Sequence, residues 1–249
     1  MAQRHAAELV ALKPDLLIGS ATPAAAALRG ATKTVPIVIA GVADPVGAGL
    51  VATLARPGGN ITGVSSNLPG MVPKKLQLLG EMVGGLQRVA FLGSTDGPAT
   101  KVFVERAQVS AKTLGIRMQV VLVSQRAEFE AAADAMVRER AQAVIVQPLF
   151  AISQAGPLVE LLVRRKLPCI SGVRPFVVAG GLMSYGFSPA DAARRTASFV
   201  DRVLKGAAPA SLPVEEPTTY ELALNLKTAR VLGIPISQSL RLRADEVVQ

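Results

Sequence analysis

Short apolar runs alternate with amphipathic stretches along most of the 249 residues of this chain. The apolar runs have the length of β-strands, and the amphipathic stretches repeat with the period of an α-helix. The predicted strands are 15–19, 35–40, 88–92, 117–123, 142–147 and 168–171, and the predicted helices are 2–12, 23–30, 73–82, 98–114, 126–139 and 156–165. Alternation of this kind needs right-handed crossovers, so it predicts an α/β fold with doubly wound parallel sheets.

Two of the helical stretches show their buried stripe with particular clarity. The stripe of 126–139 consists of Phe129, Ala132, Ala133, Met136 and Val137, and that of 98–114 consists of Val104, Ala107, Ala111 and Leu114. These residues recur three or four positions apart, so each set lies along one side of its helix. We expect both stripes to face a hydrophobic core.

A cluster of helix and strand breakers at 56–60 separates two α/β runs. Before it, Val46, Leu50 and Leu54 recur at four-residue spacing and predict a short helix. After it, residues 62–66 are interpreted as a link to the second run. The later part of the chain is predicted as strand 182–186, helix 189–205, a proline-rich segment 207–217, strand 220–225 and a final helix from residue 226.

Composition limits the classes of protein that this chain can belong to. Half of its residues are hydrophobic, which is enough for a substantial buried core, and aromatic residues are scarce. The net charge of +9 could indicate nucleic-acid binding, but the basic residues are scattered among acidic ones, so we expect no nucleic-acid partner. Cys169 is the only cysteine; it allows no internal disulfide and is expected in the core. No apolar run reaches the length of a membrane span, and we expect no signal peptide before the first predicted helix.

Three predicted strands end in the same kind of sequence, at 20–23, 43–45 and 187–189, with a proline after a small polar residue. Ser, Thr or Asp can cap a helix, and Pro fits its first turn. Asp191, three residues after Ser188, completes a pattern that resembles a capping box. In a parallel sheet such helix N-termini gather at the carboxyl ends of the strands, where they can also hold an anion. Both the capping interpretation and the ligand-binding interpretation stay open at this point.

The sequence offers no set of residues that would carry out a reaction. His5 is the only histidine and lies in the first predicted helix, so a nucleophile has no credible basic partner. No phosphate-binding glycine motif and no cluster of metal ligands is present in the sequence. We therefore expect binding without catalysis, with no cofactor and no metal.

Several longer stretches resemble the ABC transporter substrate-binding family, whose members include tryptophan- and tyrosine-binding lipoproteins. These stretches are 35–63, 179–186, 203–233 and 243–247. Phe187 departs from the family pattern, which commonly has Pro there, and 234–240 departs mildly from the usual ending. The resemblance implies a two-lobed periplasmic-binding-protein type 1 fold, each lobe a parallel sheet flanked by helices. The lobes would comprise residues 1–64 with 187–212, and residues 65–186 with 213–249.

The resemblance also implies a function and a location. The chain would capture a small solute, such as an amino acid or a related carboxylate, in the interlobe cleft by hinge closure, and would deliver it to the membrane permease subunits of an ABC importer. Relatives of this kind are periplasmic or held outside the cytoplasm by a lipid anchor. Members normally begin with a leader and a strand–helix–strand segment, so we expect the first lobe to be incomplete and interpret the start as mis-called or the gene as truncated.

On this resemblance, the ligand-binding candidates are Ser20, Thr22 and Asp44 in the first lobe, and Ser94, Thr95, Phe150, Arg174 and Tyr185 in the second. Ser20 and Thr22 would hold a carboxylate, and Asp44 would meet an ammonium group. Phe150 or Tyr185 would cover an apolar side chain, or else pack in the core. Two alternatives remain open: the effector-sensing domain of a regulator, which should carry a helix-turn-helix segment, and an α/β enzyme. The sequence does not identify the solute.

Overall fold

The chain folds into two compact units in the computed structural model, which describes residues 2–97 and 99–249. Unit 1 comprises residues 1–67 and 187–219, and unit 2 comprises residues 68–186 and 220–249. The chain therefore passes from one unit to the other three times. Residues 213–219, which the sequence prediction placed in the second lobe, lie in unit 1 because Glu215 exchanges backbone hydrogen bonds with Gly63 (2.9 Å) and Ser65 (2.8 Å).

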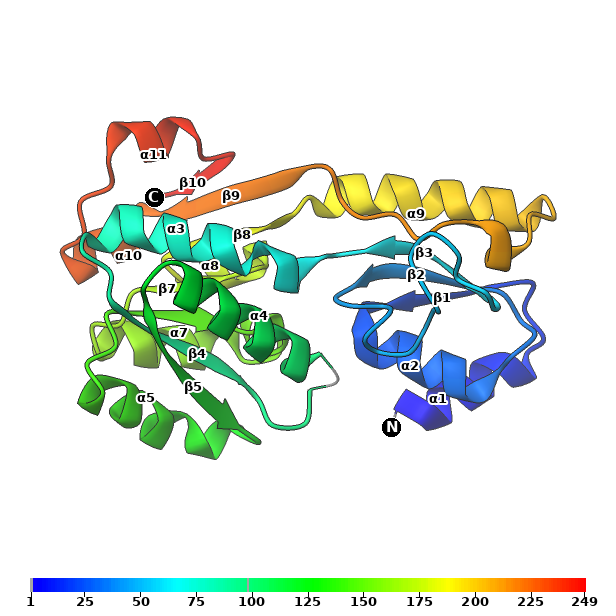
Figure 1. Cartoon of the computed structure of the whole chain (residues 1–249), viewed down its shortest axis with the longest axis horizontal. Helices are drawn as coiled ribbons and strands as arrows, with labels where there is room; N and C mark the ends of the chain where they lie inside the picture. The colour runs from blue at the N-terminus through cyan, green and yellow to red at the C-terminus, as the bar shows by residue number, and fades with distance from the viewer. Residues whose placement is uncertain (1, 98) are drawn as a thin grey trace. The chain divides into compact units, whose positions relative to one another are not determined.

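Unit 1 is built on a sheet of three parallel strands within the described residues, in the order β1-β2-β3. The strands are β1 (Leu17–Ser20), β2 (Ile37–Val42) and β3 (Ile61–Ser65), and the helices are α1 (Ala2–Ala11), α2 (Ala21–Ala31), α9 (Pro189–Leu204) and the 3-10 turn η3 (Pro209–Ser211). Alternate residues of β2 serve two cores: Ile37 and Ile39 pack with the residues of α1 and α2, whereas Val38 packs with Phe199 and Val203 of α9. Helices thus cover both faces of this sheet (Figure 1).

Residues 62–66, interpreted from the sequence as a link, mostly belong to β3, so that prediction was wrong. All five residues of β3 are buried, and the strand pairs with β2 from Ile37 to Val42. Gly63 reads as a breaker in the sequence, but here it allows a close approach: its φ is +129°, and a Cβ would lie 2.3 Å from the carbonyl oxygen of Ile39. The glycine marks tight packing inside the sheet, not the end of a strand.

The short helix expected around Val46 and Leu50 is also absent from the structure. Residues 45–49 form consecutive turns, and Val46 is exposed while Leu50 is buried. Gly49 has a φ of +65°, a left-handed conformation that interrupts a right-handed helix. The four-residue spacing of apolar side chains was therefore not sufficient to form a helix here.

Unit 2 is built on a larger sheet, in the order β10-β9-β8-β7-β6-β4-β5 among the described residues. Its strands are β4 (Arg88–Ser94), β5 (Arg117–Val123), β6 (Ala143–Val146), β7 (Cys169–Ser171), β8 (Met183–Phe187), β9 (Tyr220–Asn225) and β10 (Glu246–Val248). Strands β4 to β8 are parallel. Strand β9 runs the opposite way beside β8, because Ser188 N bonds to Thr219 O at one end and Asn225 N bonds to Leu182 O at the other.

The helices of unit 2 form two groups, α3 with α4 and α5 with α7. They are α3 (Val72–Val83), α4 (Thr100–Thr113), α5 (Phe129–Arg138), α6 (Pro148–Ser153), α7 (Ala155–Arg164), α8 (Arg174–Val178), α10 (Leu226–Leu232) and α11 (Gln238–Leu242), with 3-10 turns η1 (Leu68–Met71) and η2 (Arg126–Glu128). Helix α4 leads outward from β4 to β5, and α5 leads back across β4 to β6. Right-handed crossovers in these two directions place α4 and α5 on opposite faces of the sheet.

Most of the predicted helices and strands are present, and the predicted α/β class with parallel sheets flanked by helices is confirmed. The stripe of α5 is buried except for Val137, which is 45% exposed. In α4, Leu114 was expected in the core but lies just beyond the last helical residue and is 42% exposed. Helices α6, α8 and α11 and strand β10 were not predicted; each has six residues or fewer, too few to show a period.

Candidate functional site

The carboxyl ends of β1, β2 and β3 meet at one edge of the unit 1 sheet, because the three strands are parallel. Thr22, just after β1, is 4% exposed, and its Oγ1 accepts a hydrogen bond from Ala43 N at 3.3 Å. This bond ties the start of α2 to the loop after β2. Ser20 is exposed at the N-cap of α2, and its side chain makes no capping hydrogen bond. Ser20 therefore keeps a free hydroxyl at this edge, whereas Thr22 is already engaged as an acceptor.

The caps at this edge differ from those expected from the sequence. Helix α2 begins at Ala21, so Thr22 and Pro23 lie inside its first turn and Thr22 is not the N-cap. Ala21 has a φ of +59°, an uncommon conformation for a residue with a Cβ. Asp44 precedes turns instead of a helix, and its Oδ1 accepts from Gly47 N at 2.9 Å. One oxygen of the half-buried Asp44 carboxylate thus stabilises the turn.

Ser66 adds a polar group that the sequence interpretation did not select. It directly follows β3, its side chain is fully buried, and its Oγ has no hydrogen-bond partner in the described structure. The neighbouring Ser65 hydroxyl, by contrast, donates to Val42 O at 3.1 Å and accepts from Asn67 N at 3.1 Å. A buried hydroxyl without a partner is unusual and often marks a site that a ligand or water completes. Reading residues 62–66 as a strand would have placed Ser66 at this edge.

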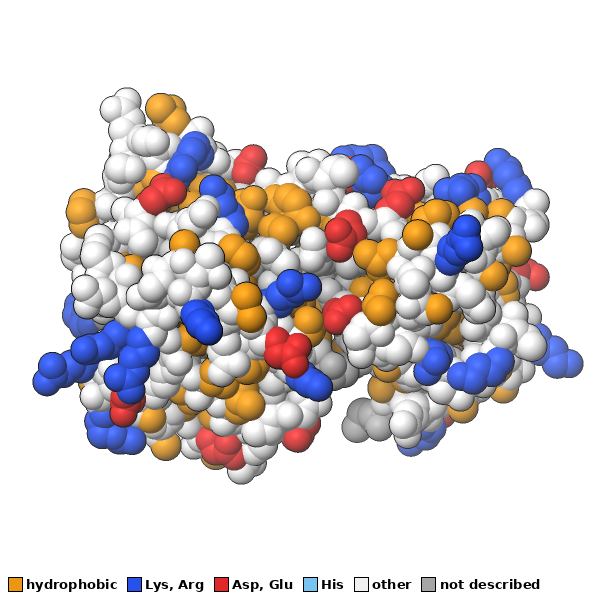
Figure 2. All heavy atoms as spheres, viewed as in Figure 1, with side chains coloured by type: hydrophobic (Ala, Val, Ile, Leu, Met, Phe, Trp, Pro, Cys, Tyr) orange, Lys and Arg blue, Asp and Glu red, His pale blue; other side chains and the backbone are white. Residues whose placement is uncertain are grey.

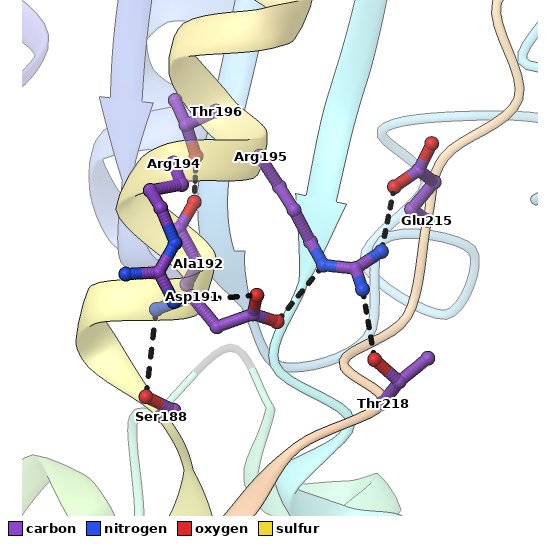
Figure 3. Close-up of polar contacts among 8 residues, drawn as sticks. All are labelled: Ser188, Asp191, Ala192, Arg194, Arg195, Thr196, Glu215 and Thr218. Atoms are coloured by element: carbon purple, nitrogen blue, oxygen red, sulfur yellow. Dashed lines mark hydrogen bonds and ion pairs between the residues drawn. The ribbon is translucent and has the colours of Figure 1, made fainter.

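A polar cluster anchors α9 to the segment that follows it (Figure 3). Ser188 Oγ accepts from Asp191 N at 3.4 Å, which confirms Ser188 as the N-cap of α9. The reciprocal half of the expected capping box is wrong, because Asp191 binds Arg195 Nε at 2.9 Å. Arg195 also donates to Glu215 Oε2 at 3.0 Å and to Thr218 Oγ1 at 2.8 Å, and the carboxylates of Asp191 and Glu215 raise its pKa. The guanidinium thus holds residues 215–218 against the first turns of α9.

The carboxyl edge of the unit 2 sheet contains a buried polar network. Ser94, the last residue of β4, is 5% exposed, and its backbone N donates to Gln147 Oε1 at 2.7 Å. Gln147 follows β6, is 4% exposed, and donates from Nε2 to Thr100 Oγ1 at 3.1 Å. Thr100 in turn donates to Ser94 O at 2.8 Å. This network joins the ends of two neighbouring strands to the start of α4, and Gln147 was not among the predicted residues.

The other predicted residues of unit 2 lie in different surroundings. Thr95 is exposed, and its backbone N donates to Val123 O at 3.0 Å. Phe150 in α6 is only 6% exposed, and its ring meets that of Phe129 edge-on, with the centroids 5.2 Å apart. Phe150 therefore packs in the core, which was the alternative to contact with a solute.

Arg174 and Tyr185 lie near the strands that close unit 2. Arg174 makes a bidentate ion pair with Glu246 of β10, with an Nη2 to Oε1 distance of 2.7 Å, and this carboxylate raises its pKa. Tyr185 in β8 is half-buried and stacks on Tyr220 of β9, with ring centroids 5.9 Å apart. Burial, aided by the charge of Asp245, raises the pKa of Tyr185, so its phenol stays protonated at neutral pH and can donate a hydrogen bond.

On the face of the molecule drawn in Figure 2, the basic residues do not gather into one patch. Figure 2 shows Lys and Arg side chains in several separate places on the viewed face, with Asp and Glu among them. In the basic run 164–166, Arg164 and Arg165 pair with Glu130, Arg165 also pairs with Asp134, and Lys166 donates to Val231 O. No helix in the described part of the chain has the length and apolarity required to cross a bilayer.

Comparison with known proteins identifies the class that this architecture defines, that of the two-lobed periplasmic binding proteins. A crystal structure of the ABC domain in complex with L-Trp from Streptococcus pneumonia matches with a TM-score of 0.92 and 31% identity, covering 99% of this chain and 83% of the other. A conserved domain protein from Vibrio cholerae matches with a TM-score of 0.92 and 30% identity, covering 99% of this chain and 82% of the other. A tyrosine-binding protein of Clostridioides difficile is 26% identical over 93% of this chain and 67% of its own length.

The chain belongs to the ABC transporter substrate binding protein family, whose pattern matches residues 1–248. This match confirms the family resemblance and the function in solute binding that were expected from the sequence. The members of this family are substrate-binding proteins of transporters.

Proposed function

We propose that this chain captures an amino acid or a closely related carboxylate for an ABC importer, and that an aromatic amino acid is the first solute to test. The observation that carries the proposal is the similarity, over 99% of this chain, to a protein whose structure contains L-Trp. The tyrosine-binding relative points to the same chemical class. The family match favours transport over the alternatives of a regulator's sensing domain and an enzyme, so the proposal includes no catalysed reaction.

On the unit 1 side, an α-amino acid needs an acceptor for its ammonium group and donors for its carboxylate. Asp44 Oδ1 is held by Gly47 N, which orients the carboxylate and leaves Oδ2 for the ammonium. The Ser66 hydroxyl, buried and without a partner, and the exposed Ser20 hydroxyl are donors for the solute carboxylate. In this proposal Thr22 positions the loop after β2 through its bond to Ala43 N.

On the unit 2 side, Tyr185 is the better candidate for contact with an apolar or aromatic side chain. Its ring is half-buried and already stacked on Tyr220, so a further ring can extend the stack. Ser94 and Thr95 offer hydroxyls close to the end of β4, whereas their backbone N–H groups already donate to Gln147 and Val123. Phe150 and Arg174 are weaker candidates, because Phe150 is buried against Phe129 and Arg174 is paired with Glu246.

The proposed mechanism is hinge closure. The chain passes between the units three times, at 67–68, 186–187 and 219–220, and these segments are the candidate hinges. A solute that contacts residues of both units favours the closed state, because the open state lacks part of those contacts. The loaded protein would then engage the permease subunits of its importer, outside the cytoplasm.

The absence of tryptophan from the chain makes a direct test possible. Because the sequence has no Trp, the emission of added L-Trp can be excited selectively and followed as it binds. We expect saturable binding of L-Trp or, in competition, of L-Tyr, and weaker binding of D-Trp. A panel of amino acids and related carboxylates in which none binds, in this assay or by calorimetry, would overturn the proposal.

Two variants test the residue assignments. Asp44→Asn keeps an oxygen for Gly47 N but removes the charge, so it should weaken amino-acid binding about 10-fold or more without unfolding the loop. Ser66→Ala should weaken binding by roughly 3- to 10-fold and leave thermal stability unchanged or higher, because the hydroxyl has no partner in the protein. Ser110→Ala, which removes a buried hydroxyl far along α4, is the matched control and should leave affinity unchanged.

A further inference from the structure

Lys75 is among the largest fully buried side chains of the protein, with 1% of its surface exposed. It lies in the first turns of α3, a twelve-residue helix in unit 2. Lysine is almost never fully buried unless its charge is paired. The positive end of a helix dipole also disfavours a cation at this position. A fully buried lysine near the start of a helix is therefore unfavourable unless another group compensates its charge.

The described residues provide no partner for the Lys75 ammonium. It makes no ion pair and no hydrogen bond in the described parts of the chain, and burial alone lowers its pKa from 10.5 to about 7. Helix α3 packs against η1, α4, β6 and β7. Of these, η1 and β6 contain no charged residue. The titratable group of β7 is the buried thiol of Cys169, and burial raises the pKa of this thiol to about 12.

Helix α4 and α3 itself do not supply a counterion either. The charged residues of α4 are Lys101, Glu105, Arg106 and Lys112; all four are exposed, and Lys101 pairs with Glu105. On α3, Glu81 pairs with Arg243, and Lys74 is a second cation. A buried cation without a carboxylate from the protein is costly, and the cost falls when an anion binds to it.

The Lys75 amine lies at the carboxyl edge of the unit 2 sheet. Its Nζ is 3.0 Å from the position that a Cβ would occupy on Gly172, the first residue after β7. Gly186, near the end of β8, approaches the same place, since a Cβ there would lie 2.0 Å from Gly172 O. Ser171, at the end of β7, donates to Val146 O, which links this point to the end of β6 and the Gln147 network. Two glycines without room for a side chain thus leave the backbone close to the amine.

We infer that Lys75 is the unit 2 residue that binds the carboxylate of the solute, an inference that rests on the proposed function. A carboxylate has about four lone-pair positions, so its bond to the lysine leaves positions for further donors. The bound anion supplies the counterion that the protein lacks. The need for this anion restricts the solutes to those with a carboxylate. It also gives a reason for a lysine whose surface is only 1% exposed.

The inference predicts proton uptake on binding. In the free protein the low pKa leaves Lys75 largely neutral at pH 8, and a bound carboxylate favours the protonated form and raises that pKa. Binding at pH 8 should therefore take up to one proton from the buffer. The affinity should fall as the pH is raised above about 7, and more steeply than for a variant without the amine.

The test compares wild type, Lys75→Met and the neighbouring control Lys74→Met, with L-Trp and with tryptamine, which lacks the carboxylate. We expect Lys75→Met to lower the affinity for L-Trp about 10- to 100-fold and to change that for tryptamine little, because only the charge-assisted bond is lost. Calorimetry in two buffers of different ionisation enthalpy should detect proton uptake for wild type and Lys74→Met, and none for Lys75→Met.

The outcomes separate the two proposals. If wild type binds L-Trp but Lys75→Met binds it equally well, or loses both ligands equally, or if wild type takes up no proton, the role of Lys75 is wrong and the proposed function stands. If wild type binds neither L-Trp nor L-Tyr but binds another carboxylate of the panel, that solute and its decarboxylated analogue replace the pair in the same comparison. If no carboxylate binds to wild type, the proposed function fails and takes this inference with it.

Discussion

The carboxyl edge of the unit 1 sheet and that of the unit 2 sheet carry different kinds of polar group. In unit 1, hydroxyls and one aspartate follow three short strands, and Gly63 packs its backbone tightly against Ile39. In unit 2, the edge contains the fully buried Lys75 and an amide network centred on Gln147. The small sheet depends on close backbone packing and buries short hydroxyl side chains such as those of Thr22 and Ser66, whereas the larger sheet buries the longer polar side chains of Gln147 and Lys75.

The largest effect is expected from Gly63→Ala in unit 1. A Cβ at this position would lie 2.3 Å from Ile39 O and would require an unfavourable φ, so the two strands would have to separate. We expect a loss of about 4 kcal/mol or more in the free energy of unfolding, measured by urea denaturation. The control is Gly30→Ala in helix α2, where an added Cβ meets nothing within 4 Å. This substitution should stabilise the protein slightly, because alanine favours a helix more than glycine does. Equal stability of the two variants would show that unit 1 does not depend on this contact.

A smaller loss is expected from Gln147→Leu in unit 2. The substitution keeps the volume but leaves Ser94 N and Thr100 Oγ1 without their buried partner. The free energy of unfolding should fall by roughly 3 kcal/mol, and amide exchange at Ser94 should accelerate. Gln108→Leu, on the exposed side of α4, serves as the control and should change little. A neutral Gln147→Leu would mean that the network adds nothing to the stability of unit 2.

The smallest effect, and one of opposite sign, is expected from Lys75→Met. The pKa of Lys75 is about 7 in the folded chain and 10.5 in the reference state, so between these values the unfolded chain binds a proton that the folded chain does not. Wild-type stability should therefore gain from this group as the pH rises from 7 to 10.5. At pH 6 the variant should be more stable by about 2 kcal/mol, with the difference shrinking at higher pH. A difference independent of pH would contradict burial of the charged amine.

Hydrophobic periodicity was sufficient to predict the α/β class, most helices and most strands, because periods of 2 and 3.6 residues are written directly in the order of the side chains. The family was identified in a different way, from the resemblance of long stretches such as 35–63 to its members. It failed for β3, where Gly63 and the surrounding small residues resemble a loop. It also failed for 45–49, where Gly49 interrupts the spacing of Val46 and Leu50.

The polar groups of the two edges could be predicted only in part. Ser20, Thr22 and Asp44 were selected because they follow predicted strands, and Ser94 was selected on the family resemblance. The hydrogen-bond partners of Thr22 and Ser94, however, come from segments distant in the chain. Ser66, Gln147 and Lys75 were not selected, because burial of a polar side chain depends on what packs over it. The order of residues within a segment determines whether it forms a helix or a strand, because the hydrophobic pattern involves only residues close in the chain. Tertiary packing decides which hydroxyl, amide or amine loses contact with water, since that depends on residues distant in the chain.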